Sequence, residues 1–295
     1  MGEGIELNAD LALQLGIQGL LTGGIYGLIG LGLSLIFGVM GVINFAHGQM
    51  IVMGMYVSFW ILTLFGIDPY LSLMVVAAVI FALGYLVQST IVNRIIDYPE
   101  AMQVVPLVSL GLILENMALL FWGPDHRSPE TALGLDAIRV GSATIDVSRL
   151  MAFGLAILFT LCIFLFLKKS NLGKSIRAAA DNRTGAILVG IKVNRINNIS
   201  FALGAATTGA AGALLLPLMP VTPHLGHDFT LIAFVVVILG GMGNLLGALF
   251  GGLILGLAES LSALWLPATM KHLVSFGILV VIMLFKPHGL FGGKR

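Results

Sequence analysis

Long runs of apolar residues, separated by short segments that hold most of the charge, constrain this chain more than any other feature of its sequence. A helix needs about 20 mostly apolar residues to cross a hydrocarbon core roughly 30 Å thick. Of the 295 residues, 58% are hydrophobic and only 10% are charged, whereas soluble domains carry about 25% charged residues. The sequence therefore predicts an all-α, polytopic transmembrane helical bundle and excludes an ordinary soluble domain.

Nine apolar runs are candidate membrane segments, and we expect eight or nine segments, some of them broken or re-entrant. Together they predict a single transmembrane domain over residues 1–295. The seventh run is short for a complete crossing. The runs cover residues 11–37, 49–66, 70–91, 104–122, 149–167, 199–219, 229–242, 243–264 and 267–285.

The sorting of charge between alternate loops predicts the orientation, because Lys and Arg accumulate in cytoplasmic loops. With nine crossings, eleven of the 15 basic residues fall on one side and nine of the 14 acids on the other. We therefore expect the N-terminus outside and the C-terminus in the cytoplasm; a hairpin over residues 229–264 that does not cross would move the N-terminus. The eleven basic residues are Arg94, Lys168, Lys169, Lys174, Arg177, Arg183, Lys192, Arg195, Lys286, Lys294 and Arg295.

Many of the 38 glycines recur at four-residue spacing within the apolar runs. In lipid, small residues at this spacing let helix backbones approach closely, and close packing of this kind drives helix association. Repetition within single runs favours contact faces over the general abundance of glycine in membrane helices. The sets are Gly19, Gly23 and Gly27; Gly204, Thr208 and Gly212; Ala205, Gly209 and Ala213; Gly247 and Gly251; and Gly252 and Gly256.

Two glycine-dense segments, residues 41–50 and 240–252, each combine an Asn with several glycines at membrane depth. They predict interrupted helices, which membranes tolerate only where the freed backbone groups face protein or a cavity, and which often line transport pathways. Asn44 and His47 in the first segment are candidates to line a pathway or to hydrogen-bond the break to a neighbouring helix, and the second role is favoured.

Two carboxylates fall inside apolar runs: Glu115, which is followed by Asn116, and Glu259. Polar groups in lipid are costly and usually have a function or a partner. A proton relay would need a second titratable partner, whose position the sequence does not give. An interhelical hydrogen bond or a position at headgroup level is the favoured interpretation.

The sequence predicts no catalytic residues, metal site or cofactor. His224 and His227, beside Asp228 in a Pro-rich outer loop, are expected to be solvated rather than to hold a metal. The single cysteine, Cys162, excludes a disulfide framework and Cys-based metal sites.

Nucleotide and nucleic-acid binding are also excluded. Residues 173–175 match the last three positions of the phosphate-binding-loop pattern. Lys168, however, occupies the position where the pattern requires glycine, and no strand is predicted before this segment. The net charge of +1 comes with no basic stripe that would bind nucleic acid.

The cytoplasmic loop at residues 168–198 carries seven basic residues and one acid. Its middle predicts a short Ala-rich helix capped by Ser175. A basic loop of this kind contacts anionic lipid or docks a cytoplasmic partner. A simple connector would not need about thirty residues.

Three segments together resemble one known family. The sequences GLIGLGLSLIFGVMGVINFAHGQMIVMGMY, SIRAAADNRTGAILVGIKVNRINNISFALGAATTGAAGALL and VVVILGGMGNLLGALFGGLILGLAES follow in the family's order and span most of the chain. They are similar to the permease subunits of ABC importers for branched-chain amino acids, of the LivH type.

The resemblance implies a chain that pairs with a second, related permease, most simply as a heterodimer, in the cytoplasmic (inner) membrane of a bacterium or archaeon. It also implies two cytoplasmic ATPase subunits and an extracytoplasmic substrate-binding protein as partners. Half of an alternating-access pathway would be formed by this chain, and ATP hydrolysis would occur in the partner subunits, so no cofactor and no enzymatic activity are expected for this chain.

By the same resemblance, part of the loop at residues 168–198 couples to the ATPases. The loop departs from the general importer pattern of Glu-Ala-Ala, three residues and Gly, because Arg177 replaces the acid and four residues separate Ala180 from Gly185. The coupling residues implied are Arg177, Ala178, Ala179, Ala180, Asp181, Arg183 and Gly190.

A leucine-like substrate is zwitterionic with an apolar side chain, so its pathway needs few polar groups; Asn44, His47 and Asn244 are the candidates. The alternative function is an ion-coupled secondary transporter or channel for a small polar solute such as an amide or urea, with Glu115 or Glu259 as the intramembrane carboxylate.

Overall fold

The computed structural model describes residues 2–129, 137–140, 143–267 and 270–292. Seven of its helical segments are long and apolar enough to cross a membrane, and two shorter apolar helices accompany them. The predicted all-α bundle is confirmed. The elements are α1 (Gly2–Met40), α2 (His47–Phe65), α3 (Pro69–Val87), the π-helical η1 (Gln88–Val92), α4 (Asn93–Ile95), α5 (Glu100–Trp122), β1 (Ala137–Val140), β2 (Ala143–Asp146), α6 (Val147–Lys169), α7 (Asn171–Asp181), α8 (Arg183–Leu188), α9 (Val193–Leu215), α10 (Leu225–Gly240), α11 (Leu245–Ser262) and α12 (Lys271–Phe285).

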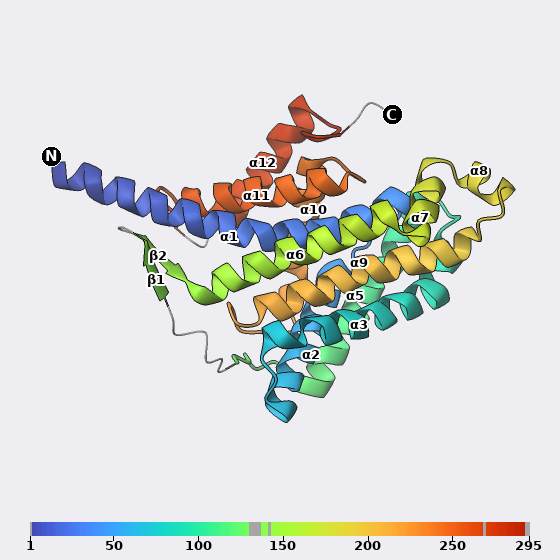
Figure 1. The fold of residues 1–295 in the computed structure, drawn as a ribbon, viewed down its shortest axis with the longest axis horizontal. Coiled ribbons are helices and arrows are strands. Elements are labelled where there is room, and N and C mark those ends of the chain that lie inside the picture. The colour runs from blue at the N-terminus through green and yellow to red at the C-terminus, as the bar shows by residue number, and fades with distance from the viewer. Residues whose placement is uncertain (1, 130–136, 141–142, 268–269, 293–295) are drawn as a thin grey trace.

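The long helices run side by side, so the bundle has two distinct ends (Figure 1). One end carries α7, α8 and residues 286–292, and we call it the basic end. The other end carries β1 and β2, which the sequence did not predict and which pair antiparallel with Ala137 opposite Asp146. The start of α1 and the end of α12 lie towards opposite ends.

The glycine triplet of α1 forms the contact with α11. A Cβ atom added to Gly19 would lie 2.7 Å from the carbonyl oxygen of Gly256, and one added to Gly23 would lie 2.8 Å from that of Gly252. Any side chain at these positions would separate the two backbones, so the predicted small-residue face is a helix contact face.

The second small-residue face lies on α9, in the middle of the bundle. A Cβ atom on Gly204 would lie 2.7 Å from the carbonyl oxygen of Gly32 in α1, and one on Gly209 would lie 2.8 Å from Cβ of Ile80 in α3. Gly212 faces α2 in the same way, 2.5 Å from the carbonyl oxygen of Ile51. This one helix therefore joins α1, α2 and α3.

Both predicted helix interruptions are present. Between α1 and α2 the chain leaves the helix at Gly41, which has a positive φ of 67°, and re-enters it at His47. Between α10 and α11 the break contains Gly241 and Gly243, with φ values of 93° and 83°. These left-handed conformations favour glycine, since other residues rarely adopt them.

The first interruption returns the chain to the middle of the bundle. The Nε2 atom of His47 lies 3.0 Å from the carbonyl oxygen of Ile29, eleven residues before the end of α1 at Met40. At 1.5 Å per helical residue, α2 therefore begins about 16 Å from the end of α1. The second interruption lies at the basic end, where Gly243 packs on Gly38, so α10 and α11 form a hairpin.

Candidate functional site

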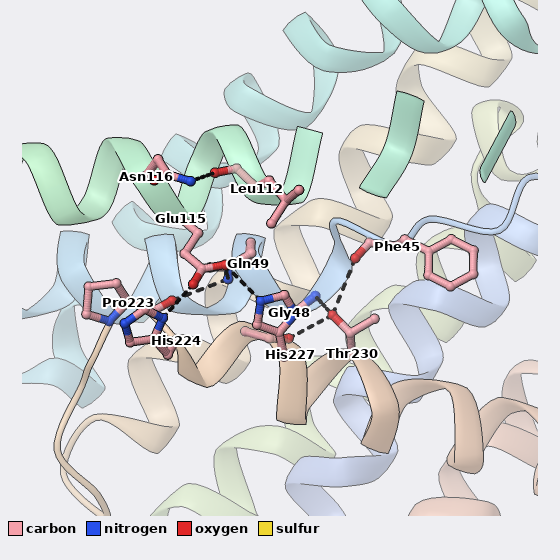
Figure 2. Close-up of polar contacts among 11 residues, drawn as sticks. Phe45, Gly48, Gln49, Leu112, Glu115, Asn116, Pro223, His224, His227 and Thr230 are labelled. Atoms are coloured by element: carbon pink, nitrogen blue, oxygen red, sulfur yellow. Dashed lines mark hydrogen bonds and ion pairs between the residues drawn. The ribbon is translucent and has the colours of Figure 1, made fainter. Parts of the chain in front are cut away.

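A polar cluster lies where α2, α5 and α10 meet (Figure 2). Glu115 of α5 accepts three hydrogen bonds with its carboxylate: one from Nε2 of Gln49 at 3.3 Å, one from Nδ1 of His224 at 2.5 Å and one from Nε2 of His227 at 2.8 Å. Gln49 and Glu115 are buried, with 2% and 6% exposure. The two histidine side chains are 64% and 61% exposed. We call these four residues the Glu115 cluster.

The Glu115 cluster lies at membrane depth. Glu115 is fifteen residues into α5, about 22 Å from its start near the basic end. One turn earlier, a Cβ atom on Gly111 would lie 3.6 Å from Cα of Ala46, next to the start of α2. The cluster is therefore level with the first interruption, in the half of the bundle away from the basic end.

The expectation of solvated histidines agrees with their exposure, but it missed their contacts with Glu115. His224 is the residue before α10 and His227 lies in its first turn, and each places one ring nitrogen against Glu115. These contacts become ion pairs when the imidazoles are protonated. They supply the titratable partners that a carboxylate at this depth requires, which the sequence could not place because 109 and 112 residues separate the pairs.

Two glycines make the cluster possible. The N–H of Gly48 donates to Oγ1 of Thr230 at 3.0 Å, and a Cβ atom on Gly48 would overlap the carbonyl oxygen of Gly226. A Cβ atom on Gly226 would in turn overlap the side-chain amide of Gln49. The first turns of α2 and α10 therefore cross with only hydrogen atoms between them.

The other intramembrane carboxylate, Glu259 of α11, joins three helices. It accepts hydrogen bonds from the hydroxyl of Tyr26 in α1 at 3.0 Å and from the hydroxyl of Ser275 in α12. Glu259 is buried, so the interhelical hydrogen bond favoured from the sequence is confirmed. Asn116 instead donates to Leu112 of its own helix at 2.7 Å.

The three pathway candidates from the sequence hold internal hydrogen bonds. Asn44 and His47 have no exposed surface; Oδ1 of Asn44 accepts from the N–H of Ala46 at 3.1 Å, and His47 contacts Ile29 as described above. Asn244 caps α11 by accepting from the N–H of Gly247 at 3.0 Å, and donates to the carbonyl oxygen of Phe291 at 2.8 Å. It borders an open cavity of about 690 Å³ at the basic end. A pathway role for these residues stays a prediction.

The segment between α6 and α9 differs from the single helix expected. It forms two helices, α7 and α8, and the predicted cap at Ser175 is wrong. The hydroxyl of Ser170 caps α7 by accepting from the N–H of Gly173 at 2.9 Å, whereas Ser175 donates to the carbonyl oxygen of Asn171. Asn182 separates the helices and caps α8 by accepting from Gly185 at 2.8 Å. Both Ser and Asn are preferred at this position.

The predicted coupling residues occupy α7, α8 and the turn that follows. Arg177, Ala178, Asp181, Arg183 and Gly190 are exposed, whereas Ala179 is buried against the bundle and Ala180 is half-buried. The guanidinium of Arg183 pairs with Asp97 at 3.3 Å, and Gly190 ends the segment with a φ of 85°. An open cavity of about 700 Å³ separates part of α7 from the ends of α1 and α6 and is lined by Arg177, Lys174 and Asp181 among others.

An apolar tip at the end of α8 was missed in the sequence. Ile187, Leu188 and Val189 are 56%, 83% and 76% exposed, beyond the basic end of the bundle. The sequence does contain three consecutive apolar residues inside a basic loop. Whether their side chains are exposed depends on the helix break at Asn182. Three adjacent exposed apolar residues are typical of a protein contact.

The described residues contain no group of three or more His, Cys, Asp or Glu side chains that could hold a metal ion. In the Glu115 cluster the imidazole nitrogens contact the carboxylate directly, and so no gap is left between them for a cation.

Interrupted membrane helices, a polar cluster at membrane depth and a basic projection at one end define a multi-pass membrane transport protein. The chain belongs to the family of permease components of the branched-chain amino acid transport system, whose family model matches residues 16–283. The expected family is therefore confirmed.

Three individual proteins illustrate the similarity. The high-affinity branched-chain amino acid transport system permease protein LivH of Escherichia coli K12 is 32% identical over 293 residues, with 95% of each chain covered. The corresponding protein LivM of the same strain is 24% identical over 299 residues, covering 92% of this chain and 68% of LivM. The solved structure of PsaBC from Streptococcus pneumoniae in complex with Fab shares the fold, with a TM-score of 0.51, 13% identity and coverage of 92% of this chain and 91% of that one.

Proposed function

We propose that this chain is the permease subunit of an ATP-driven importer for branched-chain or related hydrophobic amino acids in the cytoplasmic membrane of a bacterium or archaeon. It forms one half of the translocation pathway, and a second related permease forms the other half. Family membership supports the substrate class. The observation that carries the pathway is the exposure of His224 and His227 at membrane depth.

Exposed polar side chains at this depth are incompatible with lipid, because no lipid group there can satisfy them. They require either another protein or a water-filled passage. A second permease packed against α5 and α10 supplies both, because the passage then runs between the two chains. The similarity to both LivH and LivM of one E. coli strain supports a heterodimer.

The residues 168–198 act as the cytoplasmic coupling loop of the single domain. The apolar tip at Ile187, Leu188 and Val189, together with the exposed Arg177 of α7 and Arg183 of α8, suits a docking contact with one of two ATPase subunits. The cavity behind α7 leaves space for this helix to move relative to α1 and α6. Closure of the ATPases on ATP would move α7 and open the pathway to one side and then the other.

The orientation follows the positive-inside rule, with the basic end in the cytoplasm and β1 and β2 outside. The Glu115 cluster then lies in the outer half of the pathway, on the side from which an extracytoplasmic binding protein delivers substrate. ATP hydrolysis takes place in the partner subunits, so this chain requires no catalytic residue and no cofactor.

Reconstitution tests this function against an ion-coupled transporter or channel. The chain is co-expressed with a second permease, ATPases and a binding protein of the same organism, purified and placed in liposomes. We expect uptake of radiolabelled leucine that requires ATP and the binding protein, and stable co-elution of the ATPases. Uptake by this chain alone, driven by an ion gradient without ATP, would overturn the proposal.

A further inference from the structure

We propose that the Glu115 cluster is a binding site for a primary ammonium group, the amino end of the substrate, in the outer half of the pathway. The inference rests on the proposed transport function for its substrate, but the site is defined by its own geometry. It assigns a role to His224 and His227 as ligand-binding residues and to Glu115 as the residue that orients them.

The carboxylate of Glu115 fixes which ring nitrogens carry hydrogen. An ionised carboxylate only accepts hydrogen bonds, so Nδ1 of His224 and Nε2 of His227, which contact it, must each donate. In a neutral imidazole the opposite nitrogen is then an acceptor. Nε2 of His224 and Nδ1 of His227 therefore each present a lone pair, and no described residue hydrogen-bonds to either atom.

The two lone pairs and the negative charge behind them match the chemistry of an ammonium group. An ammonium group has three N–H donors and a positive charge, so it has a donor for each imidazole lone pair. Glu115 is 6% exposed, and its charge is screened less there than it would be in water.

One polar atom of the cluster is left without a partner. Gln49 is 2% exposed, and its Oε1 atom is buried without a hydrogen-bond partner, although its Nε2 atom donates to Glu115 and to the carbonyl oxygen of Pro223. A buried amide oxygen that lacks a donor costs free energy.

The surroundings of the cluster suit the rest of a branched-chain amino acid. Leu112 lies three residues before Glu115 on α5, and Leu231 lies four residues after His227 on α10, so each shares a helix face with a cluster residue. Both leucines are exposed, at 47% and 41%. They offer apolar surface beside the ammonium site, where an aliphatic side chain can pack.

Binding to the complex of this chain with its partner permease and ATPases, in lipid nanodiscs without the binding protein, tests the site directly. The probe is leucinamide, which carries an ammonium group, and the matched control ligand is N-acetyl-leucinamide, which carries none. Saturation-transfer difference NMR measures the dissociation constant, with empty nanodiscs subtracted to remove partition into lipid. We expect leucinamide to bind and N-acetyl-leucinamide not to bind.

The double variant His224→Ala with His227→Ala removes both acceptors. The variant leaves the buried carboxylate of Glu115 with Gln49 as a partner, so a thermal-unfolding curve checks that the double variant is still folded. We expect leucinamide to bind at least about tenfold more weakly, as the loss of two charge-assisted hydrogen bonds implies. Glu115→Gln, which removes the charge, should weaken binding in the same direction. His126→Ala, an exposed histidine of the loop after α5, is the matched control and should bind normally.

Three results would overturn the inference: no leucinamide binding by the wild-type complex, equal binding of N-acetyl-leucinamide, or unchanged binding by the double variant. A lower unfolding temperature of the double variant with unchanged binding would show that the cluster only holds helices together. The two proposals fail separately. Histidine-dependent leucinamide binding without ATP-driven leucine uptake refutes the transport proposal alone, whereas uptake without such binding refutes the site alone.

Discussion

Gly48 and Gly226 lie against one another where α2 and α10 cross, and neither position has room for a methyl group. The contact sets the position of Gln49 and, through it, one of the hydrogen bonds to Glu115. It also brings the first turns of two interrupted helices to the same depth. Enlarging Gly48 and enlarging Gly226 have different consequences. Gly48 faces the backbone of α10, whereas Gly226 faces the side chain of Gln49.

We expect Gly48→Ala to lower the free energy of unfolding by about 1–3 kcal/mol, since its methyl group would press on the backbone of Gly226 and Thr230. Gly226→Ala should cost less, because the amide of Gln49 can move aside, but it should reduce leucine uptake. Thermal unfolding in detergent and uptake in liposomes measure the two effects. Gly154→Ala is the control, since nothing lies within 4 Å of that position. Equal unfolding curves for Gly48→Ala and Gly154→Ala would contradict the prediction.

Reversal of two exposed charges should weaken ATPase docking. In Arg177→Glu with Arg183→Glu, both side chains lie at the surface of the basic end, and the one ion pair lost, Arg183 with Asp97, is exposed and worth little. We therefore expect normal membrane insertion and a loss of ATPase subunits from the purified complex, measured by gel densitometry. Lys271→Glu, exposed at the start of α12, should retain them. Undiminished co-purification of the double variant would refute the docking role.

The apolar tip of α8 should contribute to the same contact. Leu188 is 83% exposed, so Leu188→Asp removes no buried contact of the isolated chain. If a partner covers Leu188, the variant no longer buries a Leu side chain in the interface. Burial of that side chain contributes about 1.5–3 kcal/mol to the free energy of association, so we expect the dissociation constant to rise about tenfold or more. Titration of ATPase subunits onto permease nanodiscs measures it, with Thr184→Asp on the same short helix as control. An affinity that both variants leave unchanged would show that the tip is free in the complex.

Glu259 should stabilise the bundle rather than couple transport to protons. Glu259→Ala leaves the buried hydroxyl of Tyr26 without its acceptor, a cost of about 1–3 kcal/mol in the free energy of unfolding, whereas the hydroxyl of Ser275 keeps the carbonyl oxygen of Lys271 at 3.3 Å. Glu259→Gln keeps an acceptor oxygen and should cost less. Leucine uptake per folded complex should survive in Glu259→Gln. Its abolition in a fully folded protein would instead favour an ion-coupled mechanism through this carboxylate.

Much of this architecture could be predicted from local sequence. The apolar runs at 49–66, 70–91 and 104–122 match α2, α3 and α5 closely, because the length and polarity of a membrane helix are properties of one segment. Glycine spacing predicted the contact face of α1, and the glycines at 41 and 241–243 predicted both breaks, since a backbone with positive φ favours glycine. The prediction for 267–285 falls partly outside the described residues, and α12 begins at Lys271.

The predicted helix boundaries within residues 168–198 were wrong where two sequence signals supported different boundaries. Ser170 and Ser175 are both acceptable helix caps, and only the end of α6 at Lys169 decides that α7 starts at Asn171. The Ala-rich segment predicted one helix, but Asn182 adopts an extended conformation and caps a second. Leu188 lies at the end of this second helix and is exposed, so the proposed docking surface depends on a break that helix propensity alone does not identify.

The sequence by itself determined that the chain spans a membrane as a helical bundle, where its helices are interrupted and which segment is basic, because each of these properties depends on residues close together in the chain. Only the tertiary structure decided which polar groups meet. Glu115 reaches His224 and His227 because α2 and α10 cross at two glycines, one of which, Gly226, is more than a hundred residues from α5. Such a contact depends on the packing of whole helices against one another, and no local pattern of residues encodes it.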